Sequence, residues 1–379
     1  MVSLSIMASP LPDPVPLPDV HRVLVTKLRH HGDVLLTSPV FTTLARAIPA
    51  AEIDALVYLE TADILAGHPA ITQVHTIDRS WKERGLVTQV SEEWRLLRRL
   101  RARRYDLLVH LTEHSRGLNL AFLLHPRWSV TRERAARAPM WRRQFTHFYR
   151  QPEAATRHTV EANLDALRRI GIYPDSSDRR LVLVPGPDAQ SKARALLAQH
   201  GLAAHSFIHV HPGSRWLFKC WPAERTAQLL DRIVEGGFNV VVTGAPDERE
   251  RALVAAILAA IKPTTRARTL DLAAQLTLTE LAAVAGQARA FVGVDSAPMH
   301  IAAAMGTPTV ALFGPSGELQ WGPWGVAARV ITSNAHSCRP CGLDGCGGGK
   351  VSDCLTTLPV ERVYEGLRSL LAETGRETA

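Results

Sequence analysis

Short apolar segments rich in β-branched residues alternate with longer amphipathic patterns of helical period along most of the chain. Helical patterns such as "SEEWRLLRRLRARR" and "DERERALVAAILAAI" lie between these segments. Strands that alternate with helices form parallel sheets covered by helices on both faces, so we expect an α/β protein. Strands are predicted at residues 22–28, 53–58, 74–78, 105–111, 128–131, 207–211, 238–244, 290–294, 309–313 and 329–332.

The chain of 379 residues is longer than a single core usually supports. The alternation is interrupted once, at residues 174–206, where proline, glycine and charged residues gather. We predict a disordered proline-rich tail at 1–20, a first doubly wound domain at 21–185 and a second at 186–379, with the last helix able to pack back on the first domain. Ligands of such folds bind at the carboxyl ends of the strands, so we expect a site in the cleft between the domains.

The composition is that of a folded chain, with 46% hydrophobic and 21% charged residues. No apolar run approaches the roughly 20 residues of a membrane helix, and the N-terminus lacks the pattern of a signal peptide. We therefore expect a soluble, cytoplasmic protein.

Positive charge is concentrated in two segments. The formal net charge is +8, and residues 94–106 and 131–151 hold much of the excess. Such basic surfaces can be simply solvated, or they can bind an anionic partner such as nucleic acid, a phosphorylated glycan or a membrane surface. The sequence has no zinc-finger, helix-turn-helix or aromatic RNA-binding motif, which argues against nucleic acid.

The stretch "KLRHHGDVLLTSPVF" follows the first predicted strand and leads into a helical pattern. Gly32 is expected to allow an unusual backbone angle or the close approach of a ligand. Asp33 then lies at the carboxyl end of the strand. Two interpretations stay open from position alone: Asp33 caps the helix, or its carboxylate projects into the cleft and accepts a proton from a substrate hydroxyl.

A second motif, "HVHPGSRWLFKCWP", follows the strand at 207–211. A hydroxyl, a guanidinium and an ammonium group, from Ser214, Arg215 and Lys219, precede a helix start, and this combination favours a phosphate-binding loop. The alternative is a structural loop with solvated cations.

A third motif, "VGVDSAPMHIAAAMG", places Asp295 and Ser296 at the end of a buried strand and His300 in the helix that follows. Backbone N–H groups at this helix start could hold a diphosphate, and Asp295 could either cap the helix or bind sugar hydroxyls. The chain has no Asp-x-Asp pair, so a magnesium-diphosphate site of that type is not indicated.

Four cysteines lie close together near the C-terminus: Cys338, Cys341, Cys346 and Cys354. They could bind a structural zinc ion, but their spacings differ from those of a paired-knuckle site. Reduced loop thiols are the simpler interpretation for a cytoplasmic protein.

Taken in order, "KLRHHGDVLLTSPVF", "HVHPGSRWLFKCWP", "VGVDSAPMHIAAAMGTPTVALFGPS" and "CRPCGLDGCGGGKVSDCL" resemble the lipopolysaccharide heptosyltransferases of glycosyltransferase family 9, from about residue 22 to residue 355. The resemblance is strongest to the heptosyltransferase III group, which adds the side-branch heptose of the inner core. It implies a GT-B fold with two Rossmann-like domains that face a central cleft. The first domain would bind the acceptor and the second the nucleotide sugar.

The resemblance also implies an activity and roles for residues. The family transfers L-glycero-D-manno-heptose from ADP-heptose with inversion and without a required metal or other cofactor. By motif matching, Asp33 would be the general base, with Gly32 and His31 beside it as acceptor contacts. The donor contacts would be Ser214, Arg215, Lys219, Leu276, Asp295, Ser296, Ala297 and His300, where Arg215 and Ala297 depart from the residue types usual in the family.

The partners implied by the resemblance are ADP-L-glycero-D-manno-heptose as donor and the heptosyl-Kdo-lipid A inner core as acceptor. An anionic membrane surface would be a further partner, with the protein peripheral on the cytoplasmic face of the inner membrane. Two alternatives stay open. One is a family relative that uses another nucleotide sugar or core position, and the other is a non-catalytic protein that binds nucleotide sugar or lipopolysaccharide.

Overall fold

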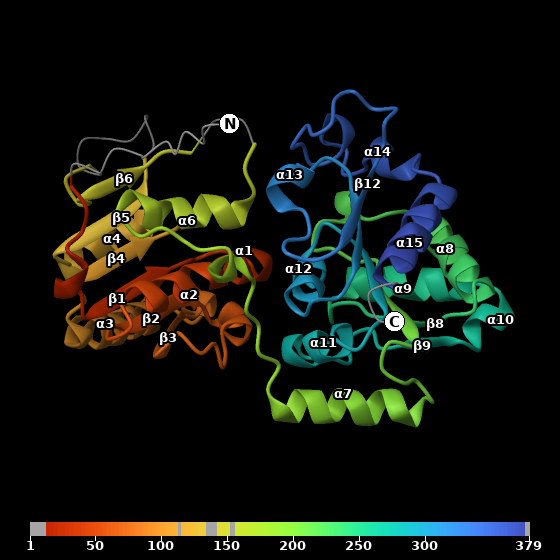
Figure 1. Cartoon of the computed structure of the whole chain (residues 1–379), viewed down its shortest axis with the longest axis horizontal. Helices are drawn as coiled ribbons and strands as arrows, with labels where there is room; N and C mark the ends of the chain where they lie inside the picture. Colours follow the sequence, from red (N-terminus) through yellow and green to blue (C-terminus); the bar gives the residue numbers. More distant parts are fainter. Residues whose placement is uncertain (1–12, 113–114, 134–141, 152–155, 376–379) are drawn as a thin grey trace, which may run out of the picture.

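A computed structural model of the chain describes residues 13–112, 115–133, 142–151 and 156–375. The described residues form two domains, each built on one six-stranded parallel sheet flanked by helices (Figure 1). The predicted α/β class with two doubly wound domains is therefore confirmed.

The first domain has the strand order β3-β2-β1-β4-β5-β6. Most of the inner strand residues are fully buried, which explains their continuous apolar runs. Its strands are β1 (Arg22–Thr26), β2 (Glu52–Tyr58), β3 (Gln73–Ile77), β4 (Leu107–His110), β5 (Trp128–Arg132) and β6 (His147–Tyr149). Its helices are α1 (His31–Leu35), α2 (Ser38–Ala47), α3 (Leu86–Arg103), α4 (Ser115–Leu124) and α6 (Thr159–Arg169), with short 3₁₀ turns η1 (Leu17–Asp19), η2 (Leu59–Ile64), η3 (Arg79–Lys82) and η4 (Ser177–Arg179).

The second domain repeats the architecture with the order β12-β11-β10-β7-β8-β9. Its strands are β7 (Phe207–His211), β8 (Asn239–Val242), β9 (Thr269–Asp271), β10 (Ala290–Val294), β11 (Thr309–Phe313) and β12 (Ala328–Thr332). Its helices are α7 (Pro187–Gln199), α8 (Ala223–Glu235), α9 (Glu248–Ala260), α10 (Pro263–Arg266), α11 (Leu278–Ala285), α12 (Ala297–Ala304), α13 (Glu318–Trp321), α14 (Asp353–Thr356) and α15 (Val360–Thr374), with 3₁₀ turns η5 (Leu217–Lys219) and η6 (Cys346–Gly348).

All ten predicted strands are present, and two further strands were missed. These are β6 and β9, each an edge strand of three residues. Both follow arginine-rich sequence, and a run of three residues is too short to show an apolar alternation.

The two ends of the chain differ from the prediction. Residues 1–12 lie outside the described part, but residues 13–20 are folded against the first domain. The side chain of Val15 is buried, and its N–H donates to Ile170 O at 3.1 Å. The last helix, α15, packs on α8, β11 and β12 of its own domain rather than on the first domain (Figure 1).

The two domains are in contact through α1 and α12, whose labels stand side by side near the centre of Figure 1. A second contact is polar. His158, the N-cap of α6, donates from Nε2 to Gly322 O at 3.0 Å, and its ring stacks on Trp324 of the second domain with centroids 4.4 Å apart. The N–H of Trp324 Nε1 in turn donates to Arg179 O at 2.8 Å.

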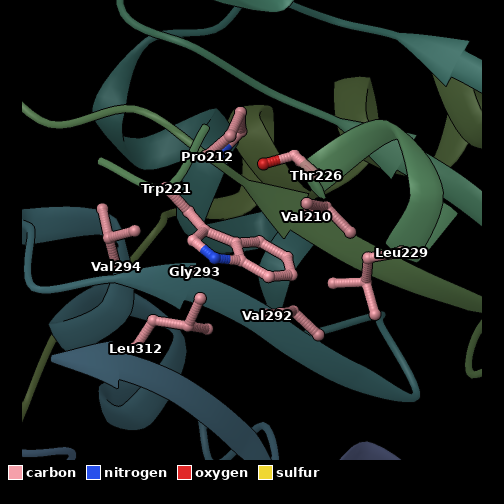
Figure 2. A pocket seen from close by; sticks show the side chains of 9 residues that line it. All are labelled: Val210, Pro212, Trp221, Thr226, Leu229, Val292, Gly293, Val294 and Leu312. Atoms are coloured by element: carbon pink, nitrogen blue, oxygen red, sulfur yellow. The ribbon is translucent and has the colours of Figure 1, made fainter. Parts of the chain in front are cut away.

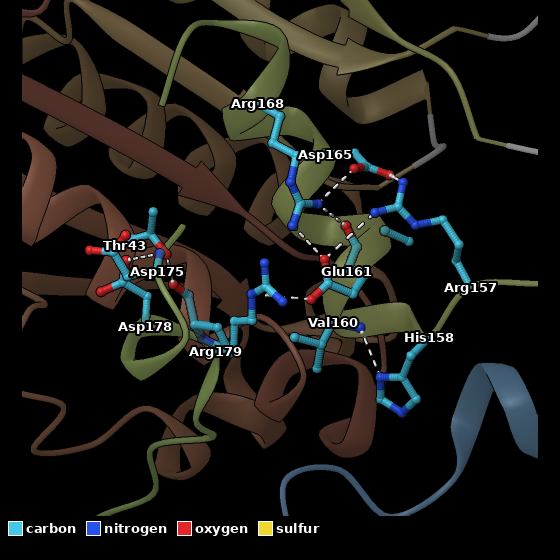
Figure 3. A network of polar contacts seen from close by, with 12 residues as sticks. Thr43, Arg157, His158, Val160, Glu161, Asp165, Arg168, Asp175, Asp178 and Arg179 are labelled. Carbon is cyan, nitrogen blue, oxygen red and sulfur yellow. Dashed lines mark hydrogen bonds and ion pairs between the residues drawn. The ribbon is translucent and has the colours of Figure 1, made fainter. Parts of the chain in front are cut away.

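A charged network holds this second contact in place (Figure 3). Glu161 in the first turn of α6 pairs with Arg157, Arg168 and Arg179, and the two longer of these contacts measure 3.6 and 3.5 Å. Because Arg179 also offers its carbonyl to Trp324, the network ties the start of α6 to the second domain.

In the first domain, a buried carboxylate connects β2 with the end of α3. Asp54 is fully buried in β2 and accepts hydrogen bonds from Arg103 Nε and Tyr105 OH, each at 2.7 Å. Burial alone would raise the pKa of Asp54, but contacts with His75, Arg103 and Tyr105 lower it. The carboxylate thus anchors the C-terminal end of α3 to the sheet.

We expect Asp54→Ala to lower the free energy of unfolding by about 3–5 kcal/mol, because Arg103 would lose its buried partner. Chemical denaturation of the purified variant measures this value. Asp63→Ala is the matched control, since Asp63 is exposed. A loss in Asp54→Ala no larger than in the control would contradict the anchoring role.

Candidate active site

The three sequence motifs converge on the places where the strand order of each sheet reverses. The reversal falls between β1 and β4 in the first domain and between β7 and β10 in the second. The loops at the carboxyl ends of such strands diverge and leave a crevice, which is the usual ligand site of open α/β sheets. The stretch around Asp33 follows β1, the loop with Lys219 follows β7, and Asp295 follows β10.

Asp33 is the third residue of α1, and His30 occupies the N-cap position. The N-cap alternative for Asp33 is therefore wrong. Its side chain is 14% exposed, and the ion pair that the described residues give it is a long one, 3.7 Å from Arg29 Nε. The carboxylate thus retains the capacity to accept a proton or a hydrogen bond from a substrate.

Gly32 lies at a close contact between the two domains. It does not adopt a left-handed backbone angle, so that part of the prediction is wrong. A Cβ atom at this position would lie 2.9 Å from Cδ2 of His300 in α12. The glycine is thus needed for close approach by the other domain, since any larger residue would collide with the imidazole ring.

His300 sits between the functional groups of both domains. Burial lowers its pKa to about 4; the carboxylates of Asp295 and Asp33 act against this shift, and the ammonium of Lys219 adds to it. Its Nδ1 is buried without a hydrogen-bond partner among the described residues. The ring is therefore neutral at physiological pH. It can donate or accept a hydrogen bond, but it has no positive charge with which to attract a phosphate.

Lys219 and Asp295 join the two loops of the second domain. Lys219 Nζ lies 2.6 Å from Asp295 Oδ2, and the two side chains are 23% and 8% exposed. The pair fixes the ammonium group at the carboxyl end of the sheet, where it can meet an anionic ligand.

Ser214 and Arg215 of the β7 loop contact different parts of the protein. Ser214 is buried, and its Oγ accepts a 3.4 Å hydrogen bond from the N–H of Trp216. Arg215 reaches across to the first domain and donates to His30 Nδ1 at 3.0 Å. Burial and this guanidinium lower the pKa of His30. The next residue, His31, donates instead to Glu60 O at 2.7 Å.

The N-terminus of α12 is free of side-chain capping. Its N-cap Ser296 donates from Oγ to Val294 O at 3.3 Å rather than accepting from the first turn, which contains Ala297. In this turn Pro298 has no N–H, and that of Met299 donates to Ser296 O at 3.2 Å. The N–H of Ala297 is left for an anion. Leu276 lies further away, half-buried between the cores of the two domains.

The sequence motifs gave no reason to select Lys27. Its side chain is buried at the end of β1, and its Nζ donates to Leu111 O and Asn163 Oδ1, each at 3.2 Å. Burial lowers its pKa to about 8, and the negative charge of Asp33 acts against this shift. The sequence does contain a signal for this residue, because a lysine directly after the apolar run "RVLVT" can be expected to be buried. A buried cation needs a polar partner.

A buried polar cluster lies beneath the β7 loop and was also missed. Glu250 Oε2 accepts from the N–H of Ala245 at 2.8 Å and lies 3.3 Å from His211 Nε2. A Cβ at Gly213 would lie 2.3 Å from the same oxygen, so the loop backbone rests on this carboxylate. Figure 2 shows a small apolar cavity in the same domain, lined by Trp221, Val292 and Leu312 among others.

The cysteine-rich loop does not support the candidate zinc site. Cys338, Cys341 and Cys346 are exposed and Cys354 is buried. Among the described residues, no group of three or more histidine, cysteine or acidic side chains is arranged to hold a metal ion.

Comparison with known proteins identifies the family. The sequence profile described as Glycosyltransferase family 9 (heptosyltransferase) matches residues 93–351. Lipopolysaccharide heptosyltransferase 3 of Escherichia coli K12 is 34% identical over 300 residues, which are 78% of this chain and 83% of that protein. The chain belongs to glycosyltransferase family 9, the heptosyltransferases.

Two solved structures of the family have the same fold. The family 9 glycosyltransferase of Veillonella parvula superimposes with a TM-score of 0.79 at 24% identity, covering 93% of this chain and 97% of its own. The ADP-heptose lipopolysaccharide heptosyltransferase II of E. coli gives a TM-score of 0.73 at 23% identity, covering 93% and 99%. The expected GT-B architecture and the expected enzyme class, a glycosyltransferase, are confirmed. None of the helices in the described part of this family member is long and apolar enough to cross a membrane.

We expect Gly32→Ala to reduce the free energy of unfolding by about 1–3 kcal/mol and to lower transferase activity, because the added methyl group forces α1 and α12 apart. Gly317→Ala is the control, since a Cβ there would meet nothing closer than 3.9 Å. Thermal unfolding and rate measurements on both variants test this. Wild-type behaviour of Gly32→Ala would contradict a tight contact between α1 and α12.

Proposed function

We propose that the protein transfers L-glycero-D-manno-heptose from ADP-L-glycero-D-manno-heptose to an inner-core heptose of lipopolysaccharide, with inversion and without a required metal. One observation carries the proposal. Asp33 of the first domain and the Lys219–Asp295 pair of the second all act on the pKa of the buried His300 ring. A nearly buried carboxylate on one domain and a cation on the other thus both act on this ring. The relatives named for ADP-heptose and for lipopolysaccharide support this choice of donor and acceptor.

In the proposed reaction, Asp33 accepts the proton of the acceptor hydroxyl as its oxygen attacks the anomeric carbon of the donor. The new glycosidic bond forms on the face opposite the phosphate, and the bond from that carbon to the phosphate oxygen breaks. ADP leaves with the electron pair, and the proton on Asp33 passes to solvent.

The second domain would stabilise the leaving group. Lys219 and the N–H of Ala297 at the start of α12 meet the negative charge that develops on the diphosphate. Ser214 and Arg215 shape the same loop, and Asp295 orients Lys219. Leu276, Ser296, Ala297 and His300 complete the proposed donor pocket.

The acceptor would enter from the first domain, where Gly32 and His31 border Asp33. Closure of the domains around both substrates would exclude water, which could otherwise hydrolyse the donor. Because the acceptor is anchored in a lipid bilayer, we place the enzyme at the cytoplasmic face of the inner membrane as a peripheral protein.

We expect Asp33→Asn to reduce transfer by about 10²–10⁴-fold, because the amide cannot accept the proton. Binding of ADP should stay within twofold of wild type, as Asp33 belongs to the other domain. Transfer is measured by mass spectrometry of heptose-deficient core acceptor incubated with ADP-heptose in the presence of EDTA. Asp63→Asn, an exposed carboxylate of the same domain, is the control.

The outcomes separate the alternatives. Near-normal turnover by Asp33→Asn rejects Asp33 as the base, and complete dependence on added metal rejects metal independence. Transfer from a different nucleotide sugar, or to another core position, would identify a relative with changed specificity. ADP-heptose binding without transfer by the wild-type enzyme would indicate a non-catalytic binding protein.

We expect Lys219→Met to weaken ADP binding by about tenfold or more, since a charge-assisted contact to phosphate is lost and Asp295 is left unpaired. Lys192→Met is the matched control, because Lys192 also forms an ion pair with a carboxylate, at 2.7 Å from Glu280. Isothermal titration calorimetry measures both affinities. Equal affinities for ADP in the two variants would remove Lys219 from the donor site.

A further inference from the structure

Helix α3 carries an apolar surface that no described part of the protein covers. Leu86, Val87, Val90 and Trp94 are 80%, 85%, 66% and 60% exposed, and with Ser91 they form one continuous surface. The face of α3 that packs on the domain is a different one, which buries Leu96 and Leu100. Contiguous exposed apolar side chains of this size mark an interaction site.

The same helix becomes strongly cationic after Trp94. Arg98 and Arg101 lie one and two turns beyond Trp94 on the same face. Both are exposed, and neither forms an ion pair with an acidic side chain among the described residues; Arg101 donates to Leu123 O at 3.0 Å. The acidic residues of the helix are already engaged, since Glu92 pairs with Arg95 at 2.5 Å and Glu93 with Arg116 at 2.8 Å. On this face of α3, the exposed apolar side chains are therefore followed by positive charges that no acidic side chain of the helix neutralises.

This surface lies at the N-terminal end of α3, which follows the carboxyl end of β3. The turn η3 precedes α3, and its Arg79 lies over the ring of Tyr58, 4.9 Å from the centroid. Arg79 is also near enough to His30 to lower the pKa of that histidine, after the larger effects of burial and Arg215. His30 is the N-cap of the helix that carries Asp33.

We propose that the α3 surface, defined as Leu86, Val87, Val90, Trp94, Arg98 and Arg101, docks the enzyme on an anionic lipid bilayer. The apolar side chains enter the boundary between head groups and acyl chains, where tryptophan is favoured. The two arginines contact anionic head groups.

A bilayer fits this surface better than a second copy of the chain. Four side chains on the first turns of one helix offer less than the roughly 800 Å² per partner that a stable protein interface buries. A bilayer needs no shape-complementary partner and attracts the adjacent arginines. The inference rests on the proposed function in one respect, namely that a lipid-anchored acceptor brings the enzyme to a membrane.

The test is co-sedimentation of the full chain with phosphatidylcholine vesicles that do or do not contain phosphatidylglycerol. The wild type should bind the anionic vesicles, and Leu86→Gln/Val90→Gln should bind them about tenfold or more weakly. Arg98→Gln/Arg101→Gln should reduce the preference for anionic over neutral vesicles. The control Leu319→Gln changes an equally exposed leucine, 68% accessible on α13, and should bind like wild type.

Three results would overturn the proposal: no vesicle binding by the wild type, equal binding by Leu86→Gln/Val90→Gln, or a wild-type dimer in sedimentation velocity that this variant abolishes. Thermal unfolding of each variant confirms that the fold is retained. Transfer to delipidated core oligosaccharide should be unchanged in Leu86→Gln/Val90→Gln. Since vesicle binding is measured without substrates, failure of the docking surface and failure of the proposed transfer are distinguished.

Discussion

The contact between Gly32 and His300 is the constraint on which the arrangement of the site depends. Because Gly32 has no side chain, α1 of the first domain can lie directly against the imidazole ring on α12 of the second. That approach brings Asp33, one residue further along, into electrostatic reach of the ring that also senses Lys219 and Asp295. Because Gly32 has no Cβ atom, the helix with the proposed base can lie close to the helix of the proposed donor site.

Each half of the site is held by charges that are already paired. In the second domain, Lys219 is fixed by Asp295, and the loop before it rests on Glu250. In the first domain, the buried Lys27 is held by a carbonyl and an amide oxygen. Such pre-arranged groups reduce the reorganisation that accompanies charge movement in the transition state. Arg215, which bonds to His30 of the first domain, links the two halves.

Much of the fold was predictable because buried parallel strands need continuous apolar runs, as in "FIHVH" and "AFVGV". Three-residue edge strands such as β9 carry no such signal, and the packing of residues 13–20 could not be inferred from a proline-rich composition. The site was predictable in part, since Asp33, Lys219 and Asp295 each follow a strand. The role of Gly32 was only partly foreseen, because its close neighbour comes from a helix more than 250 positions away in the chain.

The sequence by itself determined the two α/β domains, the family and the residue types at the carboxyl ends of three strands, since local apolar patterns and turns encode these features. Only the tertiary structure decided which residues meet. The pairing of Lys219 with Asp295 and of Arg215 with His30 depends on strand order and on domain approach, which no local pattern specifies. It also decided which side of α3 is covered, because an amphipathic pattern with apolar residues on two faces does not show which face the protein buries.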